Sequence, residues 1–228
     1  MPRTAPEVEL FKDPLVREAL VRILYCWSIR RPASGYVQGI NDLVTPFYSI
    51  FLSEYNDGYS TSVTVSQEEL QRVEADSFWC LSLLLDSIQD NYTSSQSGIA
   101  RQLKLLEDIL LRVDSPLVTH LSEQNVLLVQ FAFRWMNCLL LREFPLHMIE
   151  RLWDTYLSEE NSFRDFHVYV CAAFLRRWSL PLLKLEFQEI IMFLQSPPTA
   201  TWSLDDIEVL LSEAYLWQSL FKDSHHFQ

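Results

Sequence analysis

Hydrophobic residues recur at intervals of three and four along most of the chain, the spacing of one face of an α-helix. The clearest runs occupy residues 15–31, 99–110, 146–156 and 187–195. A capping residue or a proline bounds most of them, and Asp13-Pro14 has the form of a helix start. Strand-like alternation is confined to residues 61–65, and four glycines leave little supply for hairpin turns. The pattern therefore predicts an all-α bundle.

Further helices are predicted in both halves of the chain, at residues 43–55, 66–88, 122–144, 166–180 and 203–217. Ser66 and Glu69 have the spacing of a capping box, in which two side chains satisfy free backbone N–H groups at a helix start. Asp114-Ser-Pro116 is interpreted as a turn. We place the boundary between two lobes at this turn, which gives units of residues 1–113 and 114–228.

The composition is that of a globular protein with an acidic balance. Hydrophobic residues make up 49% of 228 residues, and 18 Lys and Arg against 30 Asp and Glu give a net charge of −12. This balance argues against a nucleic-acid binder and against a protein that binds anionic membranes, because both need a basic face. The longest uncharged run, residues 190–204, contains Pro197-Pro198 and is shorter than a membrane-spanning helix requires, so we expect no membrane insertion.

Cysteine spacing and short motifs exclude several kinds of site. Cys26, Cys80, Cys138 and Cys171 are too far apart in sequence for a zinc or redox motif. Each lies among apolar residues, so we expect buried free thiols and a reducing compartment. The sequence has no Walker loop and no His-Glu-x-x-His, so we expect no metal site, no cofactor and no nucleotide site in the chain itself.

Two of the four glycines lie within five positions of each other, in the segment SGYVQGINDL. Glycine supplies backbone conformations that a Cβ forbids. Between two predicted helices, this composition predicts a polar elbow that carries Tyr36 and Gln38, and a side-chain amide there can bond a water or a partner. The alternative is structural: Gly35 caps the first helix, and Asn41 and Asp42 open the second.

The same segment resembles the Tyr-x-Gln-Gly motif of the TBC-domain family, whose members are GTPase-activating proteins for Rab GTPases. Residues 32–47 are most similar to the subgroup called TBC domain family member 22, and the similarity extends from Pro2 to about Tyr215. The resemblance implies an all-helical fold of two lobes and a cytoplasmic role in vesicle trafficking, peripheral to endomembranes through partners. It also implies a Rab as the partner, with GTP and magnesium bound by that partner.

The resemblance also implies site residues. Members of this family supply a glutamine finger and an arginine finger to the GTPase, and Gln38 matches the glutamine, which orients the attacking water. Tyr36, Gly39, Asn41 and Asp42 surround it in the motif. They are therefore the candidates for shaping the loop and contacting the partner.

The arginine finger of the family follows the pattern Ile-x-x-Asp-x-x-Arg, and Met1-Pro2-Arg3-Thr4 matches only its end. Arg3 is therefore the candidate for neutralising charge on the γ-phosphoryl group. On this interpretation the N-terminal part of the domain is missing. We then expect weak or no activity and partly uncovered apolar faces on residues 15–31 and 43–55, which promote self-association. The alternatives are a non-catalytic helical protein-binding module and a plain helical scaffold.

Two stretches in the second half are interpreted as structural. Residues 131–145 form the densest aromatic stretch, and helical spacing explains its apolar residues as core. Arg151 and Asp154 lie three residues apart on a predicted helix, where side chains are neighbours, so we expect an ion pair between them.

Overall fold

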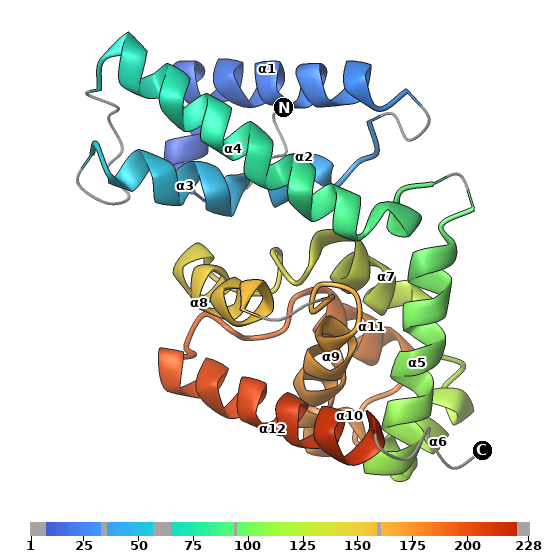
Figure 1. The fold of residues 1–228 in the computed structure, drawn as a ribbon. Coiled ribbons are helices and arrows are strands. Elements are labelled where there is room, and N and C mark those ends of the chain that lie inside the picture. Colours follow the sequence, from blue (N-terminus) through green and yellow to red (C-terminus); the bar gives the residue numbers. More distant parts are fainter. Residues whose placement is uncertain (1–7, 33–35, 57–64, 94, 159–160, 223–228) are drawn as a thin grey trace. The chain divides into compact units, whose positions relative to one another are not determined.

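The computed structural model describes residues 8–32, 36–56, 65–93, 95–158 and 161–222 (Figure 1). Across these residues every regular element is a helix, so the all-α prediction is confirmed. Contacts divide the chain into two compact units, Met1–Ser95 and Gln96–Gln228. Each unit has its own core and is described by itself.

The first unit consists of four α-helices and two short 3₁₀ helices over the part that the structure describes. Its elements are η1 (Glu9–Lys12), α1 (Pro14–Arg30), α2 (Ile40–Leu43), α3 (Thr45–Ser53), α4 (Gln67–Ser87) and η2 (Gln89–Asn91). Two predicted starts are confirmed: Asp13 accepts a hydrogen bond from the Leu15 N–H at 2.8 Å, and Ser66 with Glu69 forms a capping box.

In the first unit, α4 packs against both α1 and α3 (Figure 1). The buried side chains of α1 follow the predicted spacing and are Val16, Ala19, Leu20, Ile23, Leu24 and Trp27. Burying an aliphatic side chain of this size stabilises a fold by about 1.5–3 kcal/mol. The helix ends at Arg30 because Pro32 follows, and a residue that precedes a proline avoids the helical conformation.

The second unit contains the remaining helices of the described chain. They are α5 (Ser97–Val113), α6 (Ser115–Glu123), α7 (Val129–Cys138), α8 (Leu146–Leu157), α9 (Phe166–Arg177), α10 (Ser179–Leu182), α11 (Phe187–Gln195) and α12 (Leu204–Lys222). Residues 166–175 are all buried, so α9 is buried on every side, and α5, α7, α10 and α12 pack around it. A helix that is apolar all round belongs in the centre of a core.

The observed division of the chain falls one helix earlier than the lobe boundary predicted at Asp114. It lies between Ser95 and Gln96, because α5 packs against α6, α7 and α9 and so joins the second unit. Asp114 separates α5 from α6, where its side chain accepts a hydrogen bond from the Leu117 N–H at 3.1 Å. The turn predicted there is a helix cap.

Two predictions for the middle of the chain are wrong. No helix starts at Ser122, because this residue lies near the end of α6, a helix that the sequence pattern did not reveal. The following helix, α7, begins at Val129 and ends at Cys138, earlier than its apolar pattern predicted. It stops because Leu139 and Leu140 adopt left-handed backbone conformations, with φ of 50° and 61°, although neither is glycine.

A buried ion pair spans this bend. The Arg134 guanidinium donates to both carboxylate oxygens of Glu143 at 2.9 and 2.7 Å, and the Glu143 side chain is 1% exposed. Burial raises the pKa of Glu143 to about 7, against the lowering effect of Arg134. Arg134 also donates to the Gln195 carbonyl at 3.0 Å, which ties the end of α7 to the end of α11. The aromatic stretch between them is core, as predicted, with Trp135 fully buried.

The predicted ion pair between Arg151 and Asp154 is absent among the described residues. Arg151 instead bonds Glu208 of α12 at 2.6 and 3.0 Å, because α8 packs against α12. The cysteine prediction is partly wrong: Cys138 and Cys171 are buried free thiols, Cys80 is half-buried and Cys26 is exposed.

A histidine in the core of the second unit has both ring nitrogens hydrogen-bonded. His167 Nδ1 lies 3.0 Å from the Tyr156 hydroxyl, and Nε2 lies 3.0 Å from the Trp135 carbonyl. The side chain is fully buried, and burial lowers the pKa of His167 to about 4. The folded protein therefore holds a neutral imidazole that donates from Nε2 and accepts at Nδ1.

We expect the stability of the protein to fall between pH 6.5 and pH 4 because of His167, and His167→Gln to remove this component. The pKa of about 4 in the folded state lies below the ordinary 6.5, so the unfolded chain binds more protons in this interval. One pKa unit corresponds to about 1.4 kcal/mol, so the free energy of unfolding falls by about 3 kcal/mol between the two pKa values. Urea unfolding of both proteins across this range measures the difference; an identical pH dependence would contradict it.

Candidate functional site

The segment around Gln38 forms a tight turn before α2. The Ile40 N–H donates to the Val37 carbonyl at 3.2 Å, so Gln38 and Gly39 are the two central residues of a four-residue turn. Gly39 has φ 112° and ψ −29°, close to what the third position of a type II turn requires. Because this conformation is unfavourable for a residue with a Cβ, the glycine decides the turn. Residues 37–40 are called the Gln38 turn below.

Asn41 connects the parts of this turn. Its side-chain oxygen accepts hydrogen bonds from the Tyr36 hydroxyl at 3.0 Å and from the Gly39 N–H at 3.1 Å. Its side-chain nitrogen donates to Asp42 Oδ1 at 2.8 Å. Asn41 is 5% exposed, so these bonds form away from competing water. One amide thus fixes the turn on both sides of Gln38.

The candidate residues divide into a surface group and a buried group. Tyr36 is 51% exposed, and Gln38 is exposed at the tip of the turn. Gly39, Asn41 and Asp42 are buried. The buried group is placed to hold the turn, and the surface group is placed to meet a partner. The alternative that Asn41 caps α2 is wrong, because α2 begins at Ile40 and Asn41 lies inside it.

Two other candidates lie where the structure gives no account of them. Arg3 and Gly35 are outside the described residues. The role of Arg3 as an arginine finger is therefore a prediction from the resemblance alone. The predicted cap role of Gly35 likewise stays a prediction.

Sequence reasoning missed a groove between α1 and α4. It has a volume of about 960 Å³ and is lined by Leu15, Cys26 and Trp79, among others, with Tyr48 at its floor. The Tyr48 hydroxyl has no hydrogen-bond partner among the described residues, and burial raises the pKa of Tyr48 to about 12. The sequence held one signal for this groove: α1 and α4 carry large apolar residues outside the helix face that each of them buries.

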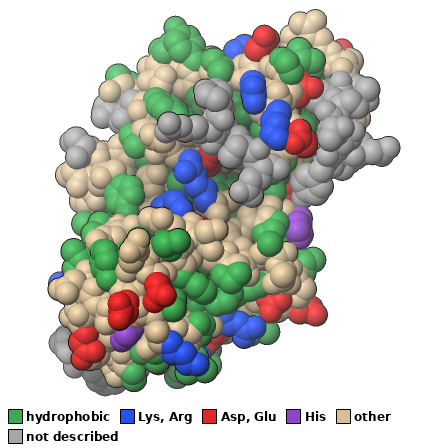
Figure 2. All heavy atoms as spheres, turned by 180° about the vertical axis from the view of Figure 1, so that it is seen from behind, with side chains coloured by type: hydrophobic (Ala, Val, Ile, Leu, Met, Phe, Trp, Pro, Cys, Tyr) green, Lys and Arg blue, Asp and Glu red, His purple; other side chains and the backbone are tan. Residues whose placement is uncertain are grey.

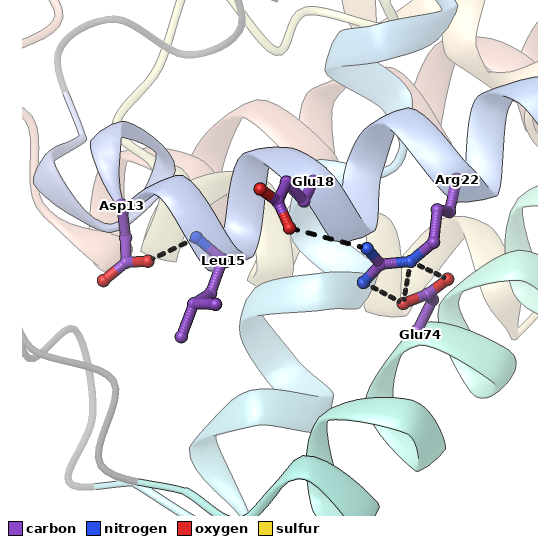
Figure 3. A network of polar contacts seen from close by, with 5 residues as sticks. All are labelled: Asp13, Leu15, Glu18, Arg22 and Glu74. Carbon is purple, nitrogen blue, oxygen red and sulfur yellow. Dashed lines mark hydrogen bonds and ion pairs between the residues drawn. The ribbon is translucent and has the colours of Figure 1, made fainter.

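An ion pair crosses this groove (Figure 3). Arg22 of α1 donates from Nε and Nη2 to the Glu74 carboxylate of α4, at 2.8 to 3.1 Å. Glu18, one turn earlier on α1, lies 3.9 Å from Arg22. The pair links the two helix surfaces within a groove whose walls contain both apolar and polar side chains.

Over the residues that the structure describes, no group of three or more His, Cys, Asp or Glu side chains is arranged to hold a metal ion. No helix of the described chain is long and apolar enough to cross a membrane. The arrangement around Gln38 can present an amide to a partner, and its described residues contain no nucleophile–base pair.

Comparison with known families shows what the chain is related to. The profile of the Rab-GTPase-TBC domain family matches residues 1–183 of the chain. The chain belongs to this family. Its relatives include the GTPase-activating protein gyp1 of Schizosaccharomyces pombe, 54% identical over 97% of this chain, and TBC1 domain family member 22B of Homo sapiens, 52% identical over the whole chain. The resemblance inferred from the sequence is confirmed.

The TBC fold is confirmed by a solved structure. The crystal structure of the Ypt/Rab-GAP domain of Gyp1p superposes with a TM-score of 0.93 and 53% identity, over 96% of this chain and 71% of that chain. The present TBC chain spans about half the length of the curated relatives it matches: the alignments cover 44% of gyp1 and 46% of member 22B.

We expect Asn41→Ala to lower the free energy of unfolding by about 1–3 kcal/mol, because the buried Gly39 N–H loses its acceptor. Tyr36→Phe is the matched control. It removes one of the bonds to the same oxygen, but at an exposed side chain, so its effect should stay below about 1 kcal/mol. Chemical denaturation measures both. Equal losses in the two variants would show that the Asn41 amide does not hold the turn.

Proposed function

We propose that this chain accelerates GTP hydrolysis by a Rab GTPase, with Gln38 as a glutamine finger. The observation that carries the proposal is the exposed Gln38 at the tip of a turn fixed by Gly39 and Asn41. Membership of the Rab-GTPase-TBC domain family and the gyp1 relatives, which are named as GTPase-activating proteins, support it.

The proposed role of Gln38 follows from two requirements of GTP hydrolysis. Charge on the transferred γ-phosphoryl group must be neutralised, and the attacking water must be held in line. The Gln38 amide can donate to one oxygen and accept from another, so it can orient a water molecule. A fixed turn matters because a misplacement of about 1 Å can cost ~10²-fold in rate. GTP and magnesium are bound by the Rab.

Arg3 would supply the second finger. Arginine stays charged and presents a fork of donors that matches phosphate oxygens, and such a finger is worth ~10³–10⁵ in rate. Tyr36, exposed beside Gln38, would contact the partner directly, whereas Gly39, Asn41 and Asp42 would act by holding the turn. Acting on a Rab would bring the chain to the cytoplasmic side of endomembranes through that partner and give it a role in vesicle trafficking.

The second candidate function is non-catalytic protein binding, and the groove between α1 and α4 favours it. Large apolar side chains are exposed on the two helices that form this groove: Trp79, which lines it, at 59%, and Tyr25 and Leu83 elsewhere on the two helices at 64% and 70%. Figure 2 shows hydrophobic side chains exposed at many places on one face of the molecule, with acidic and basic ones among them. Exposed apolar side chains beside a groove can form an interaction surface.

We expect Gln38→Ala to lower single-turnover GTP hydrolysis by a responsive Rab at least ~10²-fold, the effect of removing one fixed hydrogen-bonding group from a transition state. Gln89→Ala, at an exposed glutamine of η2, is the matched control and should keep the parent rate. Binding to the GTP-loaded Rab is measured separately. Binding without acceleration by the parent would favour the non-catalytic function, and full acceleration by Gln38→Ala would exclude Gln38 as a finger.

We also expect residues 1–228 to self-associate through the outer surfaces of α1 and α4. Replacing Trp79 and Leu83 by Gln should weaken this association at least ~10-fold, because two large apolar side chains no longer leave water. Leu180→Gln, at a side chain 76% exposed in the second unit, is the control and should change little. Sedimentation equilibrium provides the measurement; a parent chain that stays monomeric at every concentration would refute the expectation.

A further inference from the structure

One cysteine of the chain lies in the groove between α1 and α4. Cys26 is exposed and lines this groove, whose volume is about 960 Å³. A volume of this size is enough for a small molecule. The other three cysteines do not line the groove. Of the four thiols, Cys26 is therefore the one that a reagent in the groove can reach.

The charges beside Cys26 favour an anionic reagent. Arg22 and Arg30 lie one turn before and one turn after it on α1, and both line the groove. Arg22 is paired with Glu74 at 2.8 Å (Figure 3). Across the part of the chain that the structure describes, no carboxylate pairs with Arg30. Its guanidinium lies 5.2 Å from the centre of the Phe78 ring, a cation–π contact that orients it and leaves its charge in place.

Cys80 of α4 has the opposite surroundings. It is half-buried and lies outside the groove, and Asp76 comes one turn before it on the helix. Burial raises the pKa of the Cys80 thiol, and the Asp76 carboxylate adds to this effect. Because a thiol reacts as its thiolate, a raised pKa lowers the reactivity of Cys80, and Asp76 also repels an anionic reagent. Cys138 and Cys171 are buried.

A buried hydroxyl at the floor of the groove lacks a partner. Tyr48 is fully buried and lines the groove, and its hydroxyl has no hydrogen-bond partner among the described residues. Burial raises the pKa of Tyr48 to about 12, and the charges of Glu74 and Arg22 also act on it, so the hydroxyl lies near the ion pair that crosses the groove. The phenol keeps its proton at neutral pH and can donate. A buried polar group without a protein partner is expected to bond a ligand or water.

We propose that Cys26 is a site of mixed-disulfide formation with glutathione, a small anionic tripeptide thiol. The Cys26 thiolate attacks one sulfur of glutathione disulfide, and the sulfur–sulfur bond of this reagent breaks. A new bond joins Cys26 Sγ to one glutathione. The other glutathione leaves as a thiolate and takes up the proton that Cys26 lost. The disulfide reagent is itself the oxidant, so the reaction needs no other electron acceptor.

The groups that line the groove match those of glutathione. The glycine carboxylate would bond the Arg30 guanidinium, whose fork of donors fits a carboxylate. Cys26 and Arg30 are ~6 Å apart along the helix axis, within reach of a tripeptide that spans ~10 Å when extended. Glu18 lies on the other side of Cys26, with its side chain 70% exposed, and would bond the ammonium group of the γ-glutamyl residue. The Tyr48 hydroxyl would donate to a peptide carbonyl.

The experiment measures the reaction of residues 1–228 with glutathione disulfide, at neutral pH and at a concentration where sedimentation shows a monomer. Intact mass and peptide mapping should show one glutathione per chain, at Cys26. The rate is compared with that of hydroxyethyl disulfide, a neutral reagent, and each rate is divided by the rate of the same reagent with N-acetylcysteine. The normalised rate should be at least ~10-fold higher for glutathione disulfide, the effect of a hydrogen bond to a charged group.

Two substitutions test the residues that would recognise glutathione. Arg30→Gln should slow the reaction with glutathione disulfide at least ~10-fold and the reaction with hydroxyethyl disulfide by less than ~3-fold, because only the first reagent has a carboxylate. Tyr48→Phe should slow the reaction with glutathione disulfide at least ~3-fold, the effect of losing a neutral hydrogen bond. Lys184→Gln removes the same charge at an exposed site in the second unit and should react like the parent. Unchanged circular dichroism and melting temperature show that the variants are folded.

Four results would overturn the proposal. They are no modification of Cys26, modification of Cys80 at the same rate, equal normalised rates for the two reagents, and equal slowing by Arg30→Gln and Lys184→Gln. A disulfide between two copies of the chain as the sole product counts as no modification by glutathione. Because the readout is the mass of the chain, the result is independent of whether the chain accelerates GTP hydrolysis.

Discussion

The Asn41 carboxamide is the group on which the candidate site depends. Its oxygen accepts from Tyr36 and Gly39, and its nitrogen donates to Asp42, so both ends of the amide are used. These bonds hold Gly39 at a positive φ that few other residues adopt, and they leave Gln38 at the surface. A finger residue is effective only when its backbone is held still. The buried Asn41 carboxamide therefore both makes the turn rigid and leaves Gln38 exposed at its tip.

Local signals made most of the fold predictable. The Asp13-Pro14 start, the Ser66 capping box and the limits of α11 each depend on a few adjacent residues, and all three agree with the structure. The failures involve tertiary contacts. Arg151 pairs with Glu208, 57 positions away, because α8 packs against α12. The end of α7 depends on left-handed leucines, which no local preference favours.

The candidate site divides in the same way. The resemblance located Gln38, and the two glycines indicated a turn, because these signals are contiguous in sequence. That Asn41 and Asp42 are buried beneath the turn was not predictable, since polar residues in a predicted elbow are more often solvated. The groove between α1 and α4 was missed for a related reason. Its walls come from residues far apart in sequence, and periodicity within one helix does not reveal what lies opposite.

The bend after α7 has a mechanical consequence. Leu139 and Leu140 adopt conformations that cost a residue with a side chain about 1–2 kcal/mol each, yet both are fully buried. The Arg134–Glu143 pair joins the chain on either side of them, so the backbone and the ion pair together form a closed ring. Arg134 also bonds the end of α11. Loss of the Arg134–Glu143 pair would therefore free the strained leucines and, at the same time, remove a contact that holds α11.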